Sequence, residues 1–167
     1  MFTGIVRNFS NKLSTLYFHI ATFFMLVLIF STFMQVFTRY VLNSSWPWTE
    51  EMARYSFIWM NMVGAAAGFR KGTLVAVDNM LNIATGFTRL LMSLTIMLVV
   101  FVIGFILCKY GMELVILVGG SPSVTMRIPM GLIHAASPVS GVGFMINAVA
   151  GACDALEVYR KEELING

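Results

Sequence analysis

Four residues of this chain have side chains that often take part in metal binding or redox chemistry. His19 and His134 could together ligate a haem iron or a metal ion, and Cys108 and Cys153 could form a disulfide. Each pair can do so only if the fold brings its two members together. The sequence contains no Gly-x-x-x-x-Gly-Lys-Ser/Thr phosphate loop, which excludes ATP hydrolysis by that route. No Ser/His/Asp or Cys/His catalytic set can be assembled either.

The densest group of charges consists of Glu50, Glu51 and Arg54, flanked by Trp48 and Trp59. The two glutamates would lie in the first turn of a helix, where the helix dipole favours anions. Arg54 follows Glu50 at the spacing of a helical ion pair. Such a group is either a local cap with an arginine that reaches to the membrane interface or a contact site for a partner.

Four long apolar stretches must position these residues. They cover residues 13–38, 52–69, 90–109 and 129–153, and charged residues make up only 11% of the chain. A bilayer core of about 30 Å is crossed by roughly 20 apolar residues of helix, whose backbone groups are satisfied within the segment. The sequence therefore predicts an all-α membrane protein with four transmembrane helices, in one domain that covers residues 1–167. The net charge of +3 includes no basic block, which argues against nucleic acid as a partner.

The distribution of Lys and Arg predicts which side of the membrane each connection faces. With both termini inside, seven of the 11 basic residues lie on the inner side and four lie outside, which favours an N-in/C-in topology. His19 then lies near the inner end of the first span and His134 near the outer end of the fourth, roughly 20 Å apart along the membrane normal. Cys108 and Cys153 are separated in the same way. This topology excludes a shared metal ion and a disulfide.

Shorter elements are expected at the ends of the spans. Residues 2–16 have apolar residues at helical spacing, which predicts an amphipathic lead-in that lies in the inner interface before turning into the first span. A second short helix, between spans two and three, is expected to lie flat on the inner surface with Asp78 on its polar side. Thr49 is expected to cap the second span. Residues 119–122 should end the third span, Pro129 should start the fourth and Pro138 should kink it.

The spans lack the residues by which transporters usually handle cargo. No Asp, Glu, Lys or Arg lies in the middle of any span, whereas proton relays and ion-coupling sites usually place one at membrane depth. Two small-residue surfaces suit close helix packing: one at Gly64 and Gly68, and one in the fourth span within residues 131–143. Each surface either docks the helix of a partner or packs this bundle against itself. These features favour a partner subunit over a self-sufficient transporter.

A pattern of aromatic, charged and small residues runs through most of the chain. It comprises Arg39, Trp48, Glu50, Glu51, Arg54, Trp59, Gly64, Arg70, Gly72, Asp78, Pro129, Gly131 and Pro138. This pattern resembles the small membrane subunit of tripartite ATP-independent periplasmic (TRAP) transporters, the DctQ-like family, most strongly between Trp48 and Trp59. The chain departs from the family at Leu74, where a histidine is common.

The resemblance implies a three-part uptake system in the inner membrane of a bacterium. A periplasmic solute-binding protein (P-type) would deliver an organic acid, of the C4-dicarboxylate or sialic acid class, to a large elevator-type membrane subunit (M-type). The large subunit would hold the substrate and the sodium ions that drive uptake, so the resemblance implies no cofactor in this chain. This chain would be a non-catalytic scaffold that is surrounded by membrane lipids and bound to the large subunit.

The resemblance also suggests roles for the residues of the pattern. Glu50, Glu51 and Arg54 would fix the outer start of the second helix and contact the large subunit. Gly64 and Gly68 would permit close helix contact. Arg70 and Asp78 would anchor the flat inner helix at the level of the lipid headgroups.

Two other classes of membrane protein have to be weighed against this interpretation. A four-helix anchor of a redox enzyme needs two histidines at matching depth, which the predicted topology denies. A small homodimeric transporter that works alone would typically use an acidic residue inside a span, and the sequence has none there.

Overall fold

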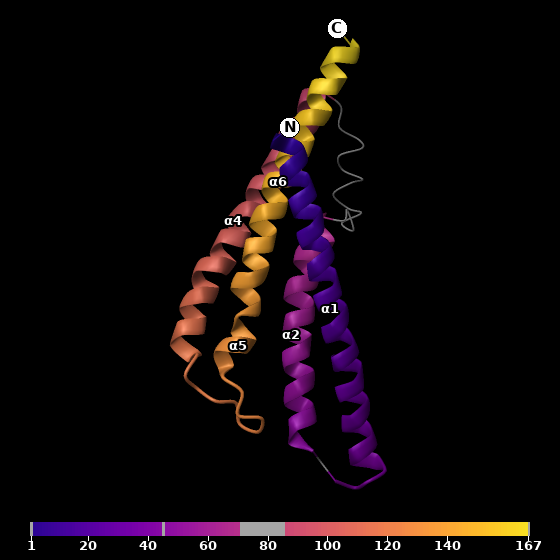
Figure 1. Ribbon diagram of the computed structural model, residues 1–167, viewed down its shortest axis with the longest axis vertical. Coiled ribbons are helices and arrows are strands. Elements are labelled where there is room, and N and C mark those ends of the chain that lie inside the picture. The colour runs from indigo at the N-terminus through magenta and orange to yellow at the C-terminus, as the bar shows by residue number, and fades with distance from the viewer. Residues whose placement is uncertain (1, 45, 71–85, 167) are drawn as a thin grey trace.

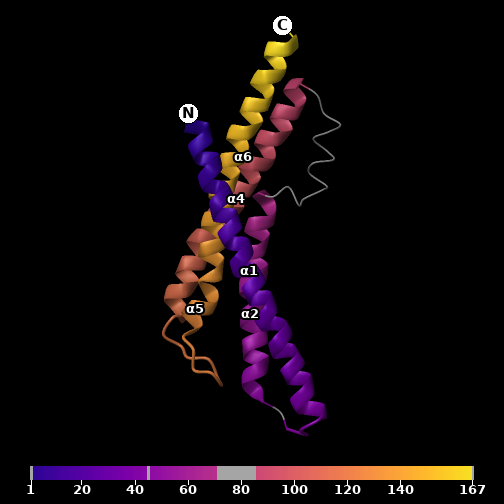
Figure 2. The same cartoon turned by 45° about the vertical axis from the view of Figure 1, so that its right-hand side comes forward.

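The computed structural model describes residues 2–44, 46–70 and 86–166, and the regular structure within these ranges is helical. The helices are α1 (Phe2–Tyr40), α2 (Pro47–Arg70), α4 (Gly86–Val118), α5 (Met130–His134) and α6 (Ala136–Asn166). α1 and α2 form one hairpin, and α4 forms a second with α5 and α6 (Figure 1). The two hairpins cross near the end of the bundle that holds both termini and diverge toward the opposite end (Figures 1 and 2).

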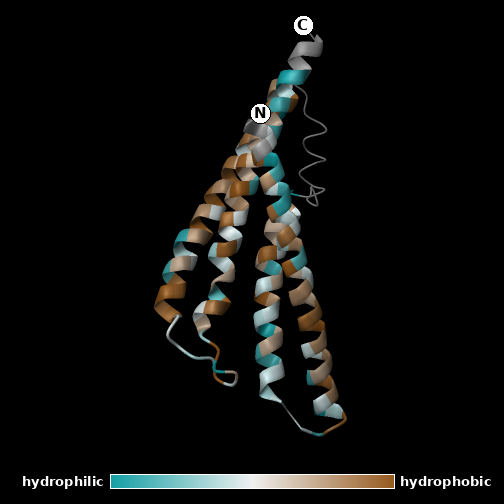
Figure 3. Ribbon diagram, viewed as in Figure 1, coloured by the Kyte–Doolittle hydropathy of each residue, from teal (hydrophilic) through white to brown (hydrophobic). Residues whose placement is uncertain are grey.

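Within the described residues, three segments are long and apolar enough to cross a bilayer: Val6–Tyr40, Phe87–Val118 and Met130–Lys161. The predicted all-helical membrane fold is confirmed to this extent. α2 has 24 residues and is also long enough, at about 1.5 Å per residue, but it is less apolar, as its paler colour in Figure 3 shows. The fourth crossing and the N-in/C-in topology stay predictions.

The expected amphipathic lead-in is not a separate element. α1 is continuous from Phe2 to Tyr40, so the chain does not turn between an interfacial segment and the first span. The reason lies in contacts with α6: Ser10 and Ser14 are buried and donate hydrogen bonds to Asn147. The sequence did not single out these two serines, which are contact residues within the bundle.

The ends of the later helices agree with the sequence in part. α4 stops at Val118, directly before the glycines that were expected to end it, but its start at Gly86 makes it longer than the predicted span. The helix before Pro138 is interrupted at Ala135, which separates α5 from α6. A proline lacks the N–H that would bond four residues back, so an interruption one turn before Pro138 is the expected kink. The predicted flat helix, with Gly72 and Asp78, lies outside the described residues.

The buried core lies where α1, α2 and α6 meet. Its buried members are Tyr17, Val63, Ala66 and Ala67, and the partly buried Trp59 packs against them. Many large apolar side chains on the outer faces of α1 and α4 are exposed; Leu117, for example, is 82% exposed. An apolar exterior around a small-residue core is the arrangement expected of a bundle that lies in lipid.

Glycines allow α4 and α6 to approach each other so closely that their backbones are in direct contact. A Cβ atom placed on Gly104 would lie 2.8 Å from the carbonyl oxygen of Gly141, and one on Gly141 would lie 2.6 Å from the carbonyl oxygen of Gly104. On Gly143, a Cβ would meet the ring of Tyr17 from α1. The small-residue surface of the fourth span therefore packs this bundle against itself, which was one of its two interpretations.

Candidate functional site

The charged group at the start of α2 divides into two parts that face different surroundings. Glu50 accepts a hydrogen bond from Arg54 at 2.7 Å, and both side chains are 61% exposed. This is the helical ion pair predicted from the spacing of the two residues. Glu51, in contrast, is buried and turned toward the connection between α4 and α5. The three charges therefore do not act as one cluster.

The carboxylate of Glu51 fastens the α4–α5 connection to α2. Its Oε1 accepts a hydrogen bond from the backbone N–H of Thr125 at 2.9 Å. Its Oε2 accepts one from the Ser123 hydroxyl and one from the backbone N–H of Met126, both at 3.0 Å. Ser123 also accepts a bond from the backbone N–H of Ile128 at 3.2 Å. One side chain thus joins the two hairpins at the end of the bundle where they diverge.

These donors hold the pKa of the Glu51 carboxyl below its ordinary value of 4.5. The backbone N–H of Met126 is the largest cause, with the N–H of Thr125 and the hydroxyl of Ser123 adding to it against the opposing effect of burial. Hydrogen bonds donated to an ionised carboxylate favour the charged form. Glu51 is therefore an anion at neutral pH, with its charge matched by donors from the connection.

α2 begins two residues before the predicted cap. Pro47 occupies the first helical position, where its missing N–H costs nothing, and the Thr49 hydroxyl donates to the carbonyl oxygen of Trp46 at 2.7 Å. The prediction that Thr49 caps the helix is wrong, because its side chain acts as a donor inside the first turn. Trp48 stacks on Trp46 with ring centroids 6.0 Å apart.

Trp59 connects three helices through one side chain. Its ring stacks on Phe24 of α1 with centroids 5.4 Å apart, and its indole N–H donates to the carbonyl oxygen of Leu132 in α5 at 3.2 Å. The sequence indicated Trp59 as a flanking aromatic of the charged group and as a residue of the family-like pattern. Its observed role is to position α5 against the first hairpin.

Asn147 is the centre of a buried polar network at the end of the bundle that holds the termini. Its Oδ1 accepts hydrogen bonds from the hydroxyls of Ser10, at 2.7 Å, and Ser14, at 3.2 Å. Its Nδ2 donates to the carbonyl oxygen of Ala66 at 2.8 Å. These bonds tie α6 to α1 and to α2. Because the side chain is only 1% exposed, each bond lies away from solvent.

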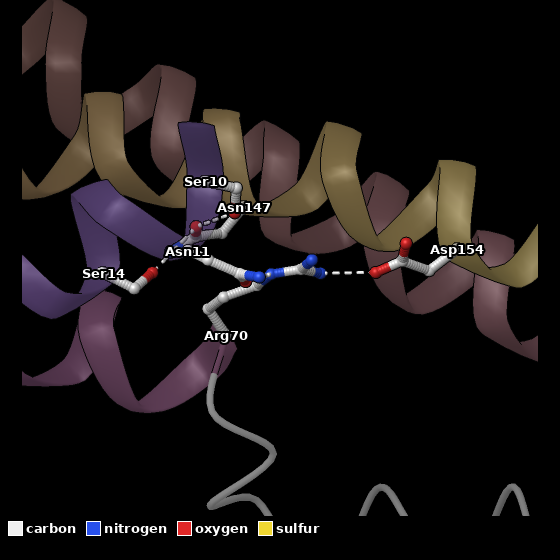
Figure 4. A network of polar contacts seen from close by, with 6 residues as sticks. All are labelled: Ser10, Asn11, Ser14, Arg70, Asn147 and Asp154. Atoms are coloured by element: carbon white, nitrogen blue, oxygen red, sulfur yellow. Dashed lines mark hydrogen bonds and ion pairs between the residues drawn. The ribbon is translucent and has the colours of Figure 1, made fainter. Parts of the chain in front are cut away.

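Arg70 continues this network toward the end of the bundle, as Figure 4 shows. Its Nε donates to Asn11 of α1 at 3.0 Å, and its Nη1 pairs with Asp154 of α6 at 2.7 Å. The Arg70 side chain is 12% exposed and that of Asp154 is 36% exposed. Arg70 thus fastens the last turn of α2 to both neighbouring helices. Asp78, which was expected to anchor the flat inner helix together with Arg70, lies outside the described residues.

Gly64 and Gly68 do not share one environment, although the sequence grouped them. A Cβ on Gly64 would make an ordinary contact of 3.6 Å with Ala21 of α1, whereas one on Gly68 would meet no atom of the described residues within 4 Å. Gly64 therefore faces α1, the other helix of its own hairpin. Gly68 is the glycine of α2 that a helix from another chain could approach.

The remaining residues of the pattern lie at helix ends. Arg39 is exposed in the last turn of α1. Pro129 precedes α5 and forms an isolated β-bridge with Pro122 across the α4–α5 connection. Gly131 is buried, and a Cβ there would lie 2.9 Å from the backbone of Gly119. Pro138 packs against Gly111 of α4.

Sequence reasoning missed the residues that complete both polar sites. Asn147 and Asp154 in α6, and Ser123 in the connection, were not singled out. Asn147 carried a usable signal, because an amide inside an apolar span needs a partner from another helix. Ser123 carried none, since a serine in a turn sequence has many local roles.

Two open apolar grooves meet at Phe101 of α4. One has a volume of about 400 Å³ and is lined by Val6, Phe9, Phe101, Met145, Ile146 and Val149. The other, of about 380 Å³, is lined by Leu94, Met97, Leu98, Phe101, Ala148, Val149 and Ala152. With almost no polar atoms in their walls, these grooves suit an acyl chain or an apolar helix and not a charged solute.

The apolar helices, the glycine contacts between them and the buried polar ties define an all-helical integral membrane protein. Residues 28–158 match the family of tripartite ATP-independent periplasmic transporters, DctQ component. Because this match covers most of the chain, the chain belongs to that family. Its members are components of transporters.

A curated relative agrees with this assignment over part of the chain. The chain is 36% identical over 72 residues to the C4-dicarboxylate TRAP transporter small permease protein DctQ of Vibrio cholerae. The matched segment is 43% of this chain and 31% of the relative, so it spans about a third of the relative's length.

Proposed function

We propose that this chain is the small permease subunit of a TRAP transporter and acts as a scaffold for the large membrane subunit. In this role it binds the large subunit in the bacterial inner membrane and supports sodium-driven uptake of an organic acid that a periplasmic solute-binding protein delivers. The family supports the class of protein. The observation that carries the scaffold role is the bracing of the two hairpins at both ends, by Glu51 at one and by Asn147 with Arg70 at the other.

The bracing favours a static subunit over a moving one. Elevator and rocking mechanisms need elements that slide or rotate against each other. In this chain the interior polar groups bond to each other across α1, α2 and α6, and the glycine contact holds α4 against α6 at backbone distance. A relative movement of the hairpins would break these buried bonds, and each broken bond leaves a polar group in an apolar surrounding.

Two candidate contact surfaces for the large subunit lie on α2: the half-buried Gly68 and the exposed ion pair of Glu50 and Arg54. A Cβ on Gly68 would meet no described atom within 4 Å, and such a position would let a helix of the large subunit approach closely. Glu50 and Arg54 lie exposed near the other end of the same helix and are the candidate polar contacts with the large subunit. In this arrangement α2 is the fourth crossing, and the chain has the N-in/C-in topology.

The printed name of the relative suggests which substrate class to test first. The named activity of the Vibrio cholerae relative concerns C4-dicarboxylates, which makes a C4-dicarboxylate the first substrate to test and sialic acid the second. The substrate and the sodium ions would bind the large subunit, so this chain would contribute to assembly and not to selectivity.

Reconstitution tests the proposal. The chain, the large subunit of the same system and the solute-binding protein are purified, and the two membrane subunits are placed in vesicles. Uptake of labelled C4-dicarboxylate or sialic acid under an inward sodium gradient should require all three proteins, and this chain alone should give none. Uptake by this chain alone would support the homodimeric transporter instead. A Soret absorbance band in the purified chain would support the redox anchor.

A further inference from the structure

The connection between α4 and α5 is a short loop that is held in one conformation. Glu51 accepts three hydrogen bonds from it, through the hydroxyl of Ser123 and the backbone N–H groups of Thr125 and Met126. Ser123 and Ile128 add a backbone bond of 2.9 Å across the base of the loop. The loop is therefore fixed by a buried anion that comes from the other hairpin.

Arg127 adopts a backbone conformation that this fastening makes possible. Its φ of 54° lies in the left-handed region, which is costly for a residue with a Cβ and persists only where the surroundings impose it. Met126 and Ile128, its two neighbours, are both held through their N–H groups. A glycine would adopt this φ without strain, so the presence of arginine suggests that its side chain is needed there.

The fixed loop displays one apolar and one cationic side chain. Val124 is 90% exposed, and Arg127 is exposed three residues further on. Arg127 is the single charged residue in the sequence of residues 119–129. The Glu51 carboxylate is buried and hydrogen-bonded to the loop, so its charge does not face a partner. The surface that the loop exposes therefore consists of the apolar Val124 side chain and the positive charge of Arg127.

We propose that Val124 and Arg127 form a docking contact for an acidic surface of the soluble solute-binding protein. This inference rests on the proposed function and on the topology that puts the loop outside. Charge complementarity argues for an acidic partner, because an exposed cation both steers and orients such a surface. The fixed backbone argues for a protein rather than lipid, because preorganisation raises affinity for a surface of defined shape. Loops and helices that enter lipid usually present larger apolar residues, such as Trp, Phe or Leu.

Binding of the purified solute-binding protein to the two-subunit membrane complex in nanodiscs tests the contact. Arg127→Gly removes the charge while suiting the left-handed backbone, so the loop should keep its fold. Val124→Ser removes the apolar side chain from an exposed position. Each variant should raise the dissociation constant at least about fivefold, the effect expected for truncating an interface anchor. The matched control is Val41→Ser, which changes an exposed valine in the α1–α2 connection; its dissociation constant should stay within about twofold of wild type, a change too small for an anchor residue.

The outcomes separate this contact from the proposed function. If the wild-type complex binds the solute-binding protein and both loop variants bind it equally well, the docking contact is overturned and the scaffold function stands. If the variants lose affinity in nanodiscs with anionic lipid but not in nanodiscs of neutral lipid, the loop contacts the membrane surface and the proposal is wrong. If the wild-type complex neither binds that protein nor takes up solute with it, both proposals fail.

Discussion

Replacing Asn147 tests whether the buried network holds the two hairpins together. Asn147→Ala removes three hydrogen bonds, with Ser10, Ser14 and the carbonyl of Ala66. Hydrogen bonds between membrane helices contribute about 0.6 kcal/mol each on average, so three amount to about 2 kcal/mol. The space left by the amide adds about 1 kcal/mol for an unfilled cavity. The free energy of unfolding should therefore fall by about 3 kcal/mol.

Reversible unfolding in mixed micelles, as the fraction of denaturing detergent is raised, measures this change. Tryptophan fluorescence is a suitable probe, because Trp59 stacks on Phe24 at the contact between α1 and α2. Asn147→Leu separates the two contributions, since it fills the space without making hydrogen bonds. Ser10→Ala is the single-bond control and should cost about 0.6 kcal/mol. A loss below about 0.5 kcal/mol for Asn147→Ala would refute the reasoning, because it would mean that the network contributes less than one average bond.

Three further predictions concern other contacts of the bundle. Glu51→Gln should speed tryptic cleavage after Arg127 several-fold, because an amide cannot accept all three hydrogen bonds. In the wild type, the stabilising effect of the Glu51 carboxylate is complete above its ordinary pKa of 4.5 and is lost as the pH falls through the lowered pKa of the folded state. An acid-stable protease should therefore cleave the wild type and the variant equally fast at acidic pH. Gly141→Ala should lower the free energy of unfolding by about 1–3 kcal/mol through overpacking against Gly104, whereas Gly68→Leu should leave unfolding unchanged and reduce co-purification of the large subunit; equal unfolding of both variants would contradict the assigned contacts. Arg70→Met should lower the free energy of unfolding by about 1–2 kcal/mol, which lies between the values for exposed and buried ion pairs. Asp154→Asn should lower it less, because the bond between Arg70 and Asn11 remains. A larger loss for Asp154→Asn than for Arg70→Met would show that the bond to Asn11 adds little.

Short-range features of the fold could be predicted because their physics is local. Apolar length decides that α1, α4 and α6 are helices fit for a bilayer, the glycines after Val118 decide where α4 stops, and Pro138 decides that the last helix is interrupted. The Glu50–Arg54 pair belongs to the same class, because four-residue spacing on a helix brings two side chains together whatever surrounds them.

The candidate site was harder to predict because its partners are far apart in the chain. Glu51 and Ser123 are separated by 72 positions, and Ser10 and Asn147 by 137. Nothing in the spacing of Glu50, Glu51 and Arg54 indicates that the middle residue turns away from its neighbours. The same limit applies to the glycines of α2, of which Gly64 faces α1 and Gly68 has no described atom within 4 Å of its Cβ position.

By itself the sequence determined that this is a helical membrane protein of the DctQ component family, since length, composition and a distinctive residue pattern need no knowledge of packing. The tertiary structure alone decided how the few polar residues are used. In an apolar bundle each buried polar group must find a partner, and the way the hairpins cross, not the order of residues along the chain, determines which partner lies within reach. For this reason Ser10 and Ser14 bind Asn147 inside the bundle, and Glu51 binds the loop of the opposite hairpin.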